Sequence, residues 1–91
     1  MDKEHKHLFF YGNYCGSCYR IKPLIKEFEQ TTKIYWIEDT SENQSLMEGL
    51  NIEYLPSMVV ADKNNNIIEL LSGGKAVENY IKQKKIGRAH V

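Results

Sequence analysis

A buried strand that passes into a helix through two cysteines dominates the first third of the chain. The apolar and aromatic run Leu8–Tyr11 predicts the strand, and Gly12-Asn13 ends it. An apolar helix face follows, with residues spaced i, i+3, i+4 and i+7: Ile21, Leu24, Ile25 and Phe28. Any fold of this chain must therefore place Cys15 and Cys18 at the N-terminal end of that helix.

The remaining patterns continue the alternation of strand and helix. Ile34–Ile37 predicts a second strand, and a capping box from Ser41 to Gln44 predicts a short helix with the apolar stripe Leu46, Met47 and Leu50. Two further strands are expected to form a hairpin around a polar turn: Met58–Ala61 and Ile67–Leu71.

A diglycine at Gly73-Gly74 separates that hairpin from a last helix, whose apolar face comprises Val77, Tyr80 and Ile81. The resulting order is β-α-β-α-β-β-α. It predicts an α/β fold in which helices cover a four-stranded mixed sheet.

Length and charge limit the classes of protein. With 91 residues we expect one domain, over 1–86, and a tail over 87–91 that is disordered or left by cloning. The formal net charge of zero argues against a dedicated nucleic-acid or membrane binder. We find neither a signal peptide nor a membrane-spanning run, and two cysteines are too few for a disulfide-stapled secreted protein. We therefore expect a cytoplasmic monomer.

The motif Cys15-Gly16-Ser17-Cys18 carries the chemistry. A C-x-x-C between a strand and a helix is typical of a redox site. Unsatisfied backbone N–H groups and the positive end of the helix dipole favour a thiolate over a thiol there. We expect Cys15 to be the exposed nucleophile and Cys18 the more buried resolving thiol.

Two cysteines could also be half of a zinc site that His5 and His7 complete. Those histidines precede the first strand's apolar run, whereas Cys15 follows its far end. At ~3.3 Å per strand residue, more than ~13 Å separates the pairs. We therefore favour the redox site, expect no metal, and expect both histidines to be ordinary exposed residues.

The order of these motifs resembles the thioredoxin family. The segment from Tyr14 to Cys18, with Pro23 five residues further on, looks like the family's active-site helix and its proline. The segment 52–57 resembles the family's cis-proline segment, and Gly73-Gly74 falls where the family has a glycine after its last strand. The resemblance implies a three-layer thioredoxin-like fold.

The resemblance also implies a cis peptide bond between Leu55 and Pro56 beside the cysteines. In the family, the backbone before this proline pairs with an extended substrate strand. The implied substrate-binding residues of this chain are Tyr14, Gly16, Ser17, Leu55, Pro56, Gly73 and Gly74.

The chain departs from the family in several places. Tyr14 stands where a tryptophan is usual, and the dipeptide between the cysteines is Gly-Ser instead of Gly-Pro. The family's buried aspartate would fall near Phe9, and its partner lysine near Tyr35. The early position of Cys15 in the chain is closer to glutaredoxins than to full-length thioredoxins. The Pro-Tyr dipeptide that glutaredoxins usually have between their cysteines is missing, however.

We therefore predict a thioredoxin-type protein-disulfide reductase whose redox group is the Cys15–Cys18 disulfide, with no other cofactor. Its expected partners are disulfide-containing proteins and a flavin-dependent thioredoxin reductase that recycles it. Two alternatives stay open. The chain could be a glutathione-dependent, glutaredoxin-like protein, or a non-catalytic module that binds a partner and senses redox state through its cysteines.

Overall fold

A mixed sheet of four strands forms the middle layer of the molecule. The computed structural model describes residues 5–89, with side chains as far as residue 84. The order across the sheet is β2-β1-β3-β4, in which β1 is parallel to β2 and antiparallel to β3, and β4 is antiparallel to β3. The strands are β1 (Lys6–Tyr11), β2 (Ile34–Glu38), β3 (Ser57–Ala61) and β4 (Ile67–Ser72).

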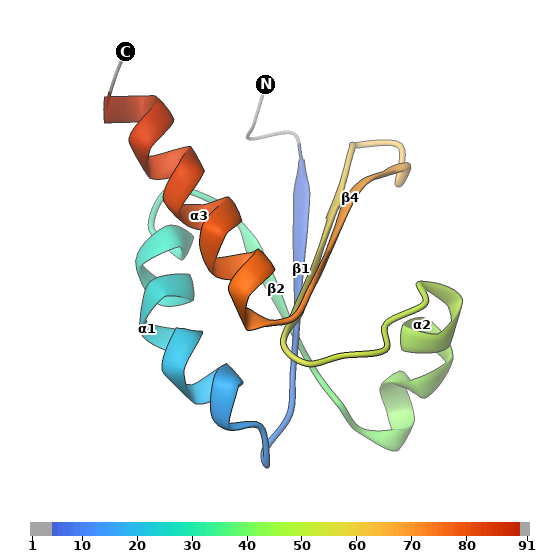
Figure 1. Ribbon diagram of the computed structural model, residues 1–91. Helices are drawn as coiled ribbons and strands as arrows, with labels where there is room; N and C mark the ends of the chain where they lie inside the picture. The colour runs from blue at the N-terminus through green and yellow to red at the C-terminus, as the bar shows by residue number, and fades with distance from the viewer. Residues whose placement is uncertain (1–4, 90–91) are drawn as a thin grey trace.

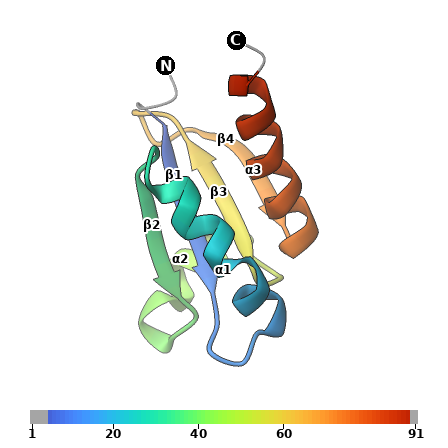
Figure 2. The ribbon, with the colours of Figure 1, turned by 90° about the vertical axis from the view of Figure 1, so that its left-hand side faces the viewer.

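Helices form the two outer layers. Helices α1 (Gly16–Glu29) and α3 (Gly74–Ala89) lie on one face of the sheet, and both begin at the same end of it (Figures 1 and 2). The short helix α2 (Gln44–Gly49), preceded by the 3₁₀ turn η2 (Ser41–Asn43), lies on the other face. The predicted order of elements and the three-layer α/β architecture are confirmed.

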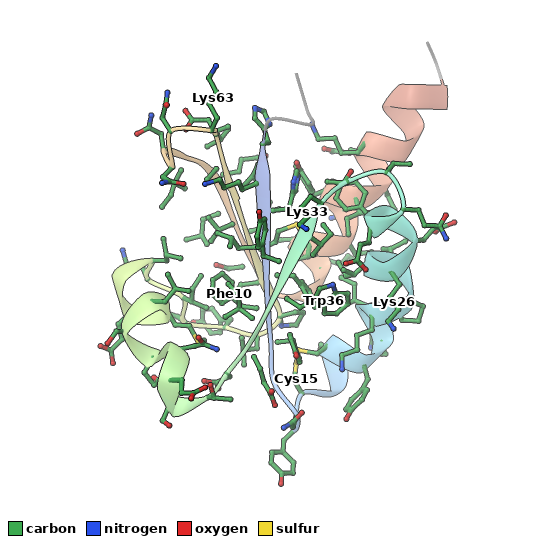
Figure 3. The ribbon with its side chains drawn as sticks, turned by 180° about the vertical axis from the view of Figure 1, so that it is seen from behind. Phe10, Cys15, Lys26, Lys33, Trp36 and Lys63 are labelled. Carbon is green, nitrogen blue, oxygen red and sulfur yellow. A yellow bond between two sulfur atoms is a disulfide. The ribbon has the colours of Figure 1, made fainter. Side chains whose placement is uncertain are left out.

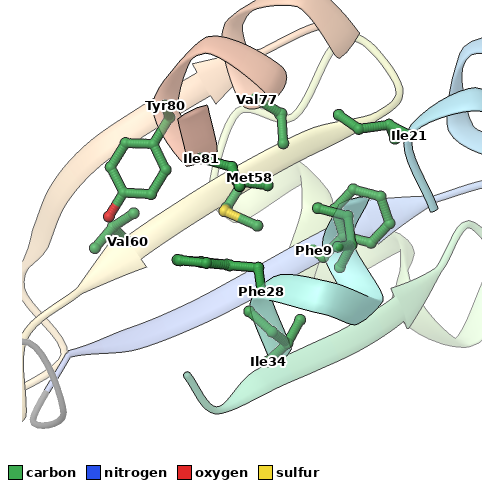
Figure 4. Packing of buried hydrophobic residues seen from close by; sticks show 10 residues of the cluster. Phe9, Ile21, Phe28, Ile34, Met58, Val60, Val77, Tyr80 and Ile81 are labelled. Atoms are coloured by element: carbon green, nitrogen blue, oxygen red, sulfur yellow. The ribbon is translucent and has the colours of Figure 1, made fainter. Parts of the chain in front are cut away.

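The main core lies between the sheet and the pair α1 and α3. Phe9 and Met58 from the sheet are fully buried there against Ile25 of α1 and Ile81 of α3 (Figure 4). A smaller core on the other face packs Met47 of α2 against the sheet. The large core fixes where α1 begins, and therefore where the cysteines lie.

The expectation of exposed histidines is wrong for His7. Its side chain is buried, its Nε2 atom lies 3.0 Å from the Tyr80 hydroxyl, and its ring contacts Phe28 edge to face. The cause is that β1 begins at Lys6, ahead of the predicted apolar run, so His7 belongs to the strand and faces α3.

The predicted capping box is also wrong. Ser41 begins the 3₁₀ turn instead of capping α2, and neither η2 nor α2 has a side-chain hydrogen bond at its N-cap. Gln44 donates its hydrogen bond to the Asp39 carboxylate. The Asn43 side chain donates to the backbone carbonyl of Glu38 instead, so side-chain bonds to the end of β2 hold this turn.

The last helix is longer than the sequence pattern indicates. It runs to Ala89 and thus includes 87–89 of the predicted tail, whereas 90–91 lie outside the described residues. Among the described residues, no helix is both long enough and apolar enough to cross a membrane.

Truncating the core at α3 should cost much more stability than the same truncation at the edge of the sheet. Ile81 is fully buried, whereas Ile68 of β4 keeps 48% of its surface exposed. We expect Ile81→Ala to lower the free energy of unfolding by about 2–5 kcal/mol and Ile68→Ala by less than about 1 kcal/mol. Urea denaturation measures both, and equal losses would contradict this core.

Candidate active site

Cys15 is the N-cap of helix α1. Its backbone is extended (φ −108°, ψ 105°), and its Sγ accepts a hydrogen bond from the backbone N–H of Cys18 at 3.1 Å. This is the position that Ser, Asp or Asn usually occupies, where a side-chain acceptor satisfies an N–H group that has no partner within the helix. A thiolate at this atom would receive that hydrogen bond and the favourable end of the helix dipole.

The two sulfur atoms differ in exposure. Cys18 is completely buried, whereas Cys15 is partly exposed at the end of the sheet (Figure 3). In the structure they form a disulfide, with 5.2 Å between the Cα atoms. This separation lies within the ordinary range for disulfides. Of the two cysteines, only Cys15 is open to a substrate.

The loop before β3 brings the predicted proline segment to the cysteines. The Leu55–Pro56 peptide bond is cis, as the resemblance implied. The Leu55 side chain packs over Gly12, because a Cβ atom on Gly12 would lie only 3.1 Å from Leu55 Cδ1 and 3.9 Å from Cys15 Cβ. Gly12 therefore lets Leu55 approach the turn that carries Cys15.

The diglycine Gly73-Gly74 lies at the same end of the molecule as the cysteines and Pro56. The Gly73 N–H donates a hydrogen bond of 2.9 Å to the carbonyl of Pro56. A Cβ atom on Gly74 would lie 3.5 Å from Ser17 Cβ and 3.6 Å from Pro56 Cγ. Ser17, Pro56 and Gly74 thus converge from three separate segments. Ser17 is exposed and Gly74 partly exposed, and together they form what we call the substrate surface, whereas the Pro56 side chain beneath them is completely buried.

The other two predicted substrate-binding residues, Tyr14 and Gly16, lie on the surface. Tyr14 is fully exposed, and Gly16 is exposed at the first position of α1, where an added Cβ atom would meet no other segment within 4 Å.

The sequence analysis missed Gly12, which was assigned only to a turn. The sequence signal was a glycine at the end of a strand, three residues before Cys15, because glycine is the residue that permits a close approach of another segment. The Lys22 side chain of α1 also reaches this end of the sheet. Its ammonium group lies 4.9 Å from the ring centre of Tyr11 and 4.7 Å from that of Tyr19, and it thus links the end of β1 to α1.

Apolar groups fill the positions where the family has its buried ion pair. Phe9 is completely buried, with its ring 5.1 Å from that of Trp36 in an edge-to-face contact. Tyr35 is 42% exposed. Among the described side chains, the only buried polar ones are those of His7 and Ser57, so no carboxylate lies beneath Cys18.

The structure gives no support to the zinc alternative. Within residues 5–89, no three side chains of the kinds that bind metals come together. His7 points toward Tyr80 in the core, and Cys15 lies beyond the other end of β1.

These features define a class of protein: a thioredoxin-like fold with a dithiol at the start of its first helix and a cis-proline beside it. The family model described as Thioredoxin matches residues 2–84. The chain belongs to the thioredoxin family.

Similar proteins agree with this assignment. Over 79 residues, the chain is 35% identical to Thioredoxin-1 of Caenorhabditis elegans, a match that covers 85% of the chain. It spans 66% of that relative, slightly less than two thirds of its length. The crystal structure of thioredoxin f2 from Chlamydomonas reinhardtii has the same fold, with a TM-score of 0.75 and 18% identity over 92% of this chain and 82% of that one.

A chain with the same fold as this protein is also found in the solved structure of a complex. A chain in the crystal structure of a ferredoxin:thioredoxin reductase and thioredoxin f2 complex matches with a TM-score of 0.73 and 21% identity, over 94% of this chain and 79% of that one.

The two glycines of the diglycine should respond differently to alanine. Gly73 has φ +90°, which a side chain rarely tolerates, whereas a Cβ on Gly74 would make only ordinary contacts. We expect Gly73→Ala to lower the free energy of unfolding by about 1–2 kcal/mol and Gly74→Ala to change it by at most about 0.5 kcal/mol. Thermal or urea unfolding checks this, and a reversed ranking would contradict the backbone described here.

Proposed function

We propose that the chain is a thiol–disulfide oxidoreductase that reduces disulfides of other proteins. The Cys15 thiolate attacks one sulfur of the substrate disulfide, which forms a mixed disulfide and releases the other substrate sulfur as a thiolate. The Cys18 thiolate then attacks Cys15 Sγ and releases the second substrate sulfur. Two electrons pass from the dithiol to the substrate, whose thiolates take up two protons, and the Cys15–Cys18 disulfide remains.

The observation that carries the proposal is the position of Cys15 as the N-cap of α1. The hydrogen bond from the Cys18 N–H to Cys15 Sγ favours the charged form of the nucleophile. Burial of Cys18 keeps the resolving sulfur away from substrates and within reach of the mixed disulfide. The disulfide is itself the redox group, so the reaction needs no metal, nucleotide or flavin from this chain.

Cys18 loses its proton without a buried carboxylate as base. Phe9 occupies the place beneath α1, so water or the leaving substrate thiolate takes the proton. The substrate backbone pairs with the backbone at Leu55, a partly exposed residue of the loop before β3, next to Ser17 and Gly74.

A separate reductase regenerates the dithiol. Membership of the thioredoxin family and the fold shared with the chain from the ferredoxin:thioredoxin reductase complex both support a partner of the reductase type. We propose a flavin-dependent thioredoxin reductase as donor and the cytoplasm as compartment, where thiols are kept reduced. The site uses residues of one chain only, which is consistent with a monomer.

Replacing each cysteine should stop the reaction at a different step. We expect Cys15→Ser to abolish reduction of a protein disulfide such as that of insulin, because no thiolate remains for the first attack. Cys18→Ser should retain that attack and accumulate the mixed disulfide, because nothing resolves it. Turbidity follows insulin reduction, and mass spectrometry under non-reducing conditions detects the adduct.

Full activity of Cys15→Ser would refute the mechanism. Binding of a disulfide-bearing partner that survives replacement of both cysteines, together with inactivity of the parent chain, would favour the alternative of a non-catalytic redox-sensing module.

The electron donor can be identified by turnover. We expect NADPH with a flavin-dependent thioredoxin reductase to sustain insulin reduction, and glutathione alone not to do so, because the dipeptide between the cysteines is Gly16-Ser17 and not the Pro-Tyr that is usual in glutaredoxins. The measurement is the rate of NADPH oxidation with each donor system, with ferredoxin:thioredoxin reductase as a third arm. Turnover with glutathione alone would instead support the glutaredoxin-like alternative.

A further inference from the structure

A groove of about 610 Å³ runs between α1 and α3 and opens at the substrate surface. Ser17 and Gly74, which converge beside Pro56, also line its near end. Both helices begin there and lead away from the site side by side (Figure 2). A substrate segment attached to Cys15 and lying over Ser17 and Gly74 therefore has a direct continuation into this groove.

Three cations and two carboxylates line the groove. Arg20 and Lys75 are exposed and lie near the start of the two helices, where Glu78 is as far from the start of α3 as Arg20 is from the start of α1, whereas Glu27 lies further along α1. Glu78 is paired with Lys82, whose Nζ lies 2.9 Å from its Oε2 atom. Among the described side chains, neither near-end cation forms an ion pair.

Three cations act on the carboxylate of Glu78. The pKa of Glu78 is lowered from its ordinary value, chiefly by the hydrogen bond and charge of Lys82, with smaller contributions from Lys75 and Arg20. The Glu78 charge therefore does not neutralise all three cations. The three cations of the lining exceed its two carboxylates by one charge, and Arg20 and Lys75 line the groove together with Ser17 of the cysteine motif.

We propose that this near end is a substrate-selecting subsite, in which Arg20 and Lys75 attract a carboxylate of an Asp or Glu close to the substrate protein's disulfide. The proposal rests on the oxidoreductase function above and names its preferred substrate class. Because both cations are exposed, their effect falls on the association rate and is screened by salt. The expected discrimination is therefore modest, about two- to fivefold for each cation, which corresponds to roughly 0.4–1 kcal/mol.

Matched peptide disulfides test the proposal. Three peptides share one sequence around a disulfide and carry Glu, Gln or Lys at the flanking positions. The second-order rate constant for their reduction by the reduced chain is measured by acid quench, alkylation and mass spectrometry, at low and high ionic strength. The neutral compound bis(2-hydroxyethyl) disulfide serves as a substrate too small and uncharged to sense the groove.

The variants remove or reverse one charge at a time. Arg20→Gln and Lys75→Gln remove the two near-end cations, and Arg20→Glu reverses one. Lys26→Gln is the matched control, because it removes the same charge from α1 at a position that does not line the groove.

We expect the parent chain to reduce the Glu peptide fastest and the Lys peptide slowest, with the difference shrinking at high salt. Arg20→Gln and Lys75→Gln should each lower the Glu-to-Gln rate ratio, and Arg20→Glu should shift the preference toward the Lys peptide. Lys26→Gln should keep the parent ratio. The peptide rates of each variant are divided by its rate with bis(2-hydroxyethyl) disulfide, because the loss of a cation near Cys15 also changes the reactivity of the thiolate itself.

Equal rates for the three peptides with the parent chain would overturn the subsite, as would a ratio that Lys26→Gln changes as much as Arg20→Gln. In either case reduction of bis(2-hydroxyethyl) disulfide would leave the oxidoreductase function standing. Failure of the parent chain to reduce any of the four disulfides would overturn that function, and the subsite with it.

Discussion

The hydrogen bond from the Cys18 N–H to the Cys15 sulfur is the interaction around which the site is arranged. It requires a cysteine at the N-cap of a helix, and that helix must be held rigidly against a sheet. The large apolar core supplies this support, because Phe9 and Met58 of the sheet and Ile25 of α1 are completely buried together. The chemistry at one end of the molecule thus depends on packing in its middle.

A second requirement is that segments far apart in sequence meet at the same end of the sheet. Gly12 allows this, because a side chain there would press against Leu55, whereas Gly74 meets Ser17 and Pro56 at ordinary contact distances. The Gly73 N–H ties the same loop to the start of α3. The absence of a side chain at Gly12 is therefore part of how this end of the molecule is formed.

Much of the fold could be predicted because hydrophobic periodicity reports directly on which faces are buried. The strand before Cys15, the helix after Cys18 and the final hairpin all follow from such patterns. His7 could not be placed this way, since a polar residue ahead of an apolar run gives no sign that the strand begins earlier. The capping box failed for a related reason, because Asn43 and Gln44 bond to the end of β2 instead of to their own helix.

The part of the site that is built from residues close together in the sequence could be predicted. The spacing of Cys15 and Cys18 and the following helix give the nucleophile and the resolving thiol from sequence alone. The packing of Leu55 on Gly12, and the groove that Arg20 and Lys75 both line, depend on how segments far apart in the sequence are placed in the fold. Patterns along the chain do not encode such contacts.

A redox titration of the Cys15–Cys18 couple tests the central claim most directly. The reduced and oxidised forms would be equilibrated in defined thiol–disulfide buffers and counted by alkylation and mass. A reductase of the thioredoxin type predicts a reversible two-electron couple near about −270 mV. If the two cysteines never form an internal disulfide across the buffer range, the chain cannot complete the proposed cycle, and the oxidoreductase function is contradicted.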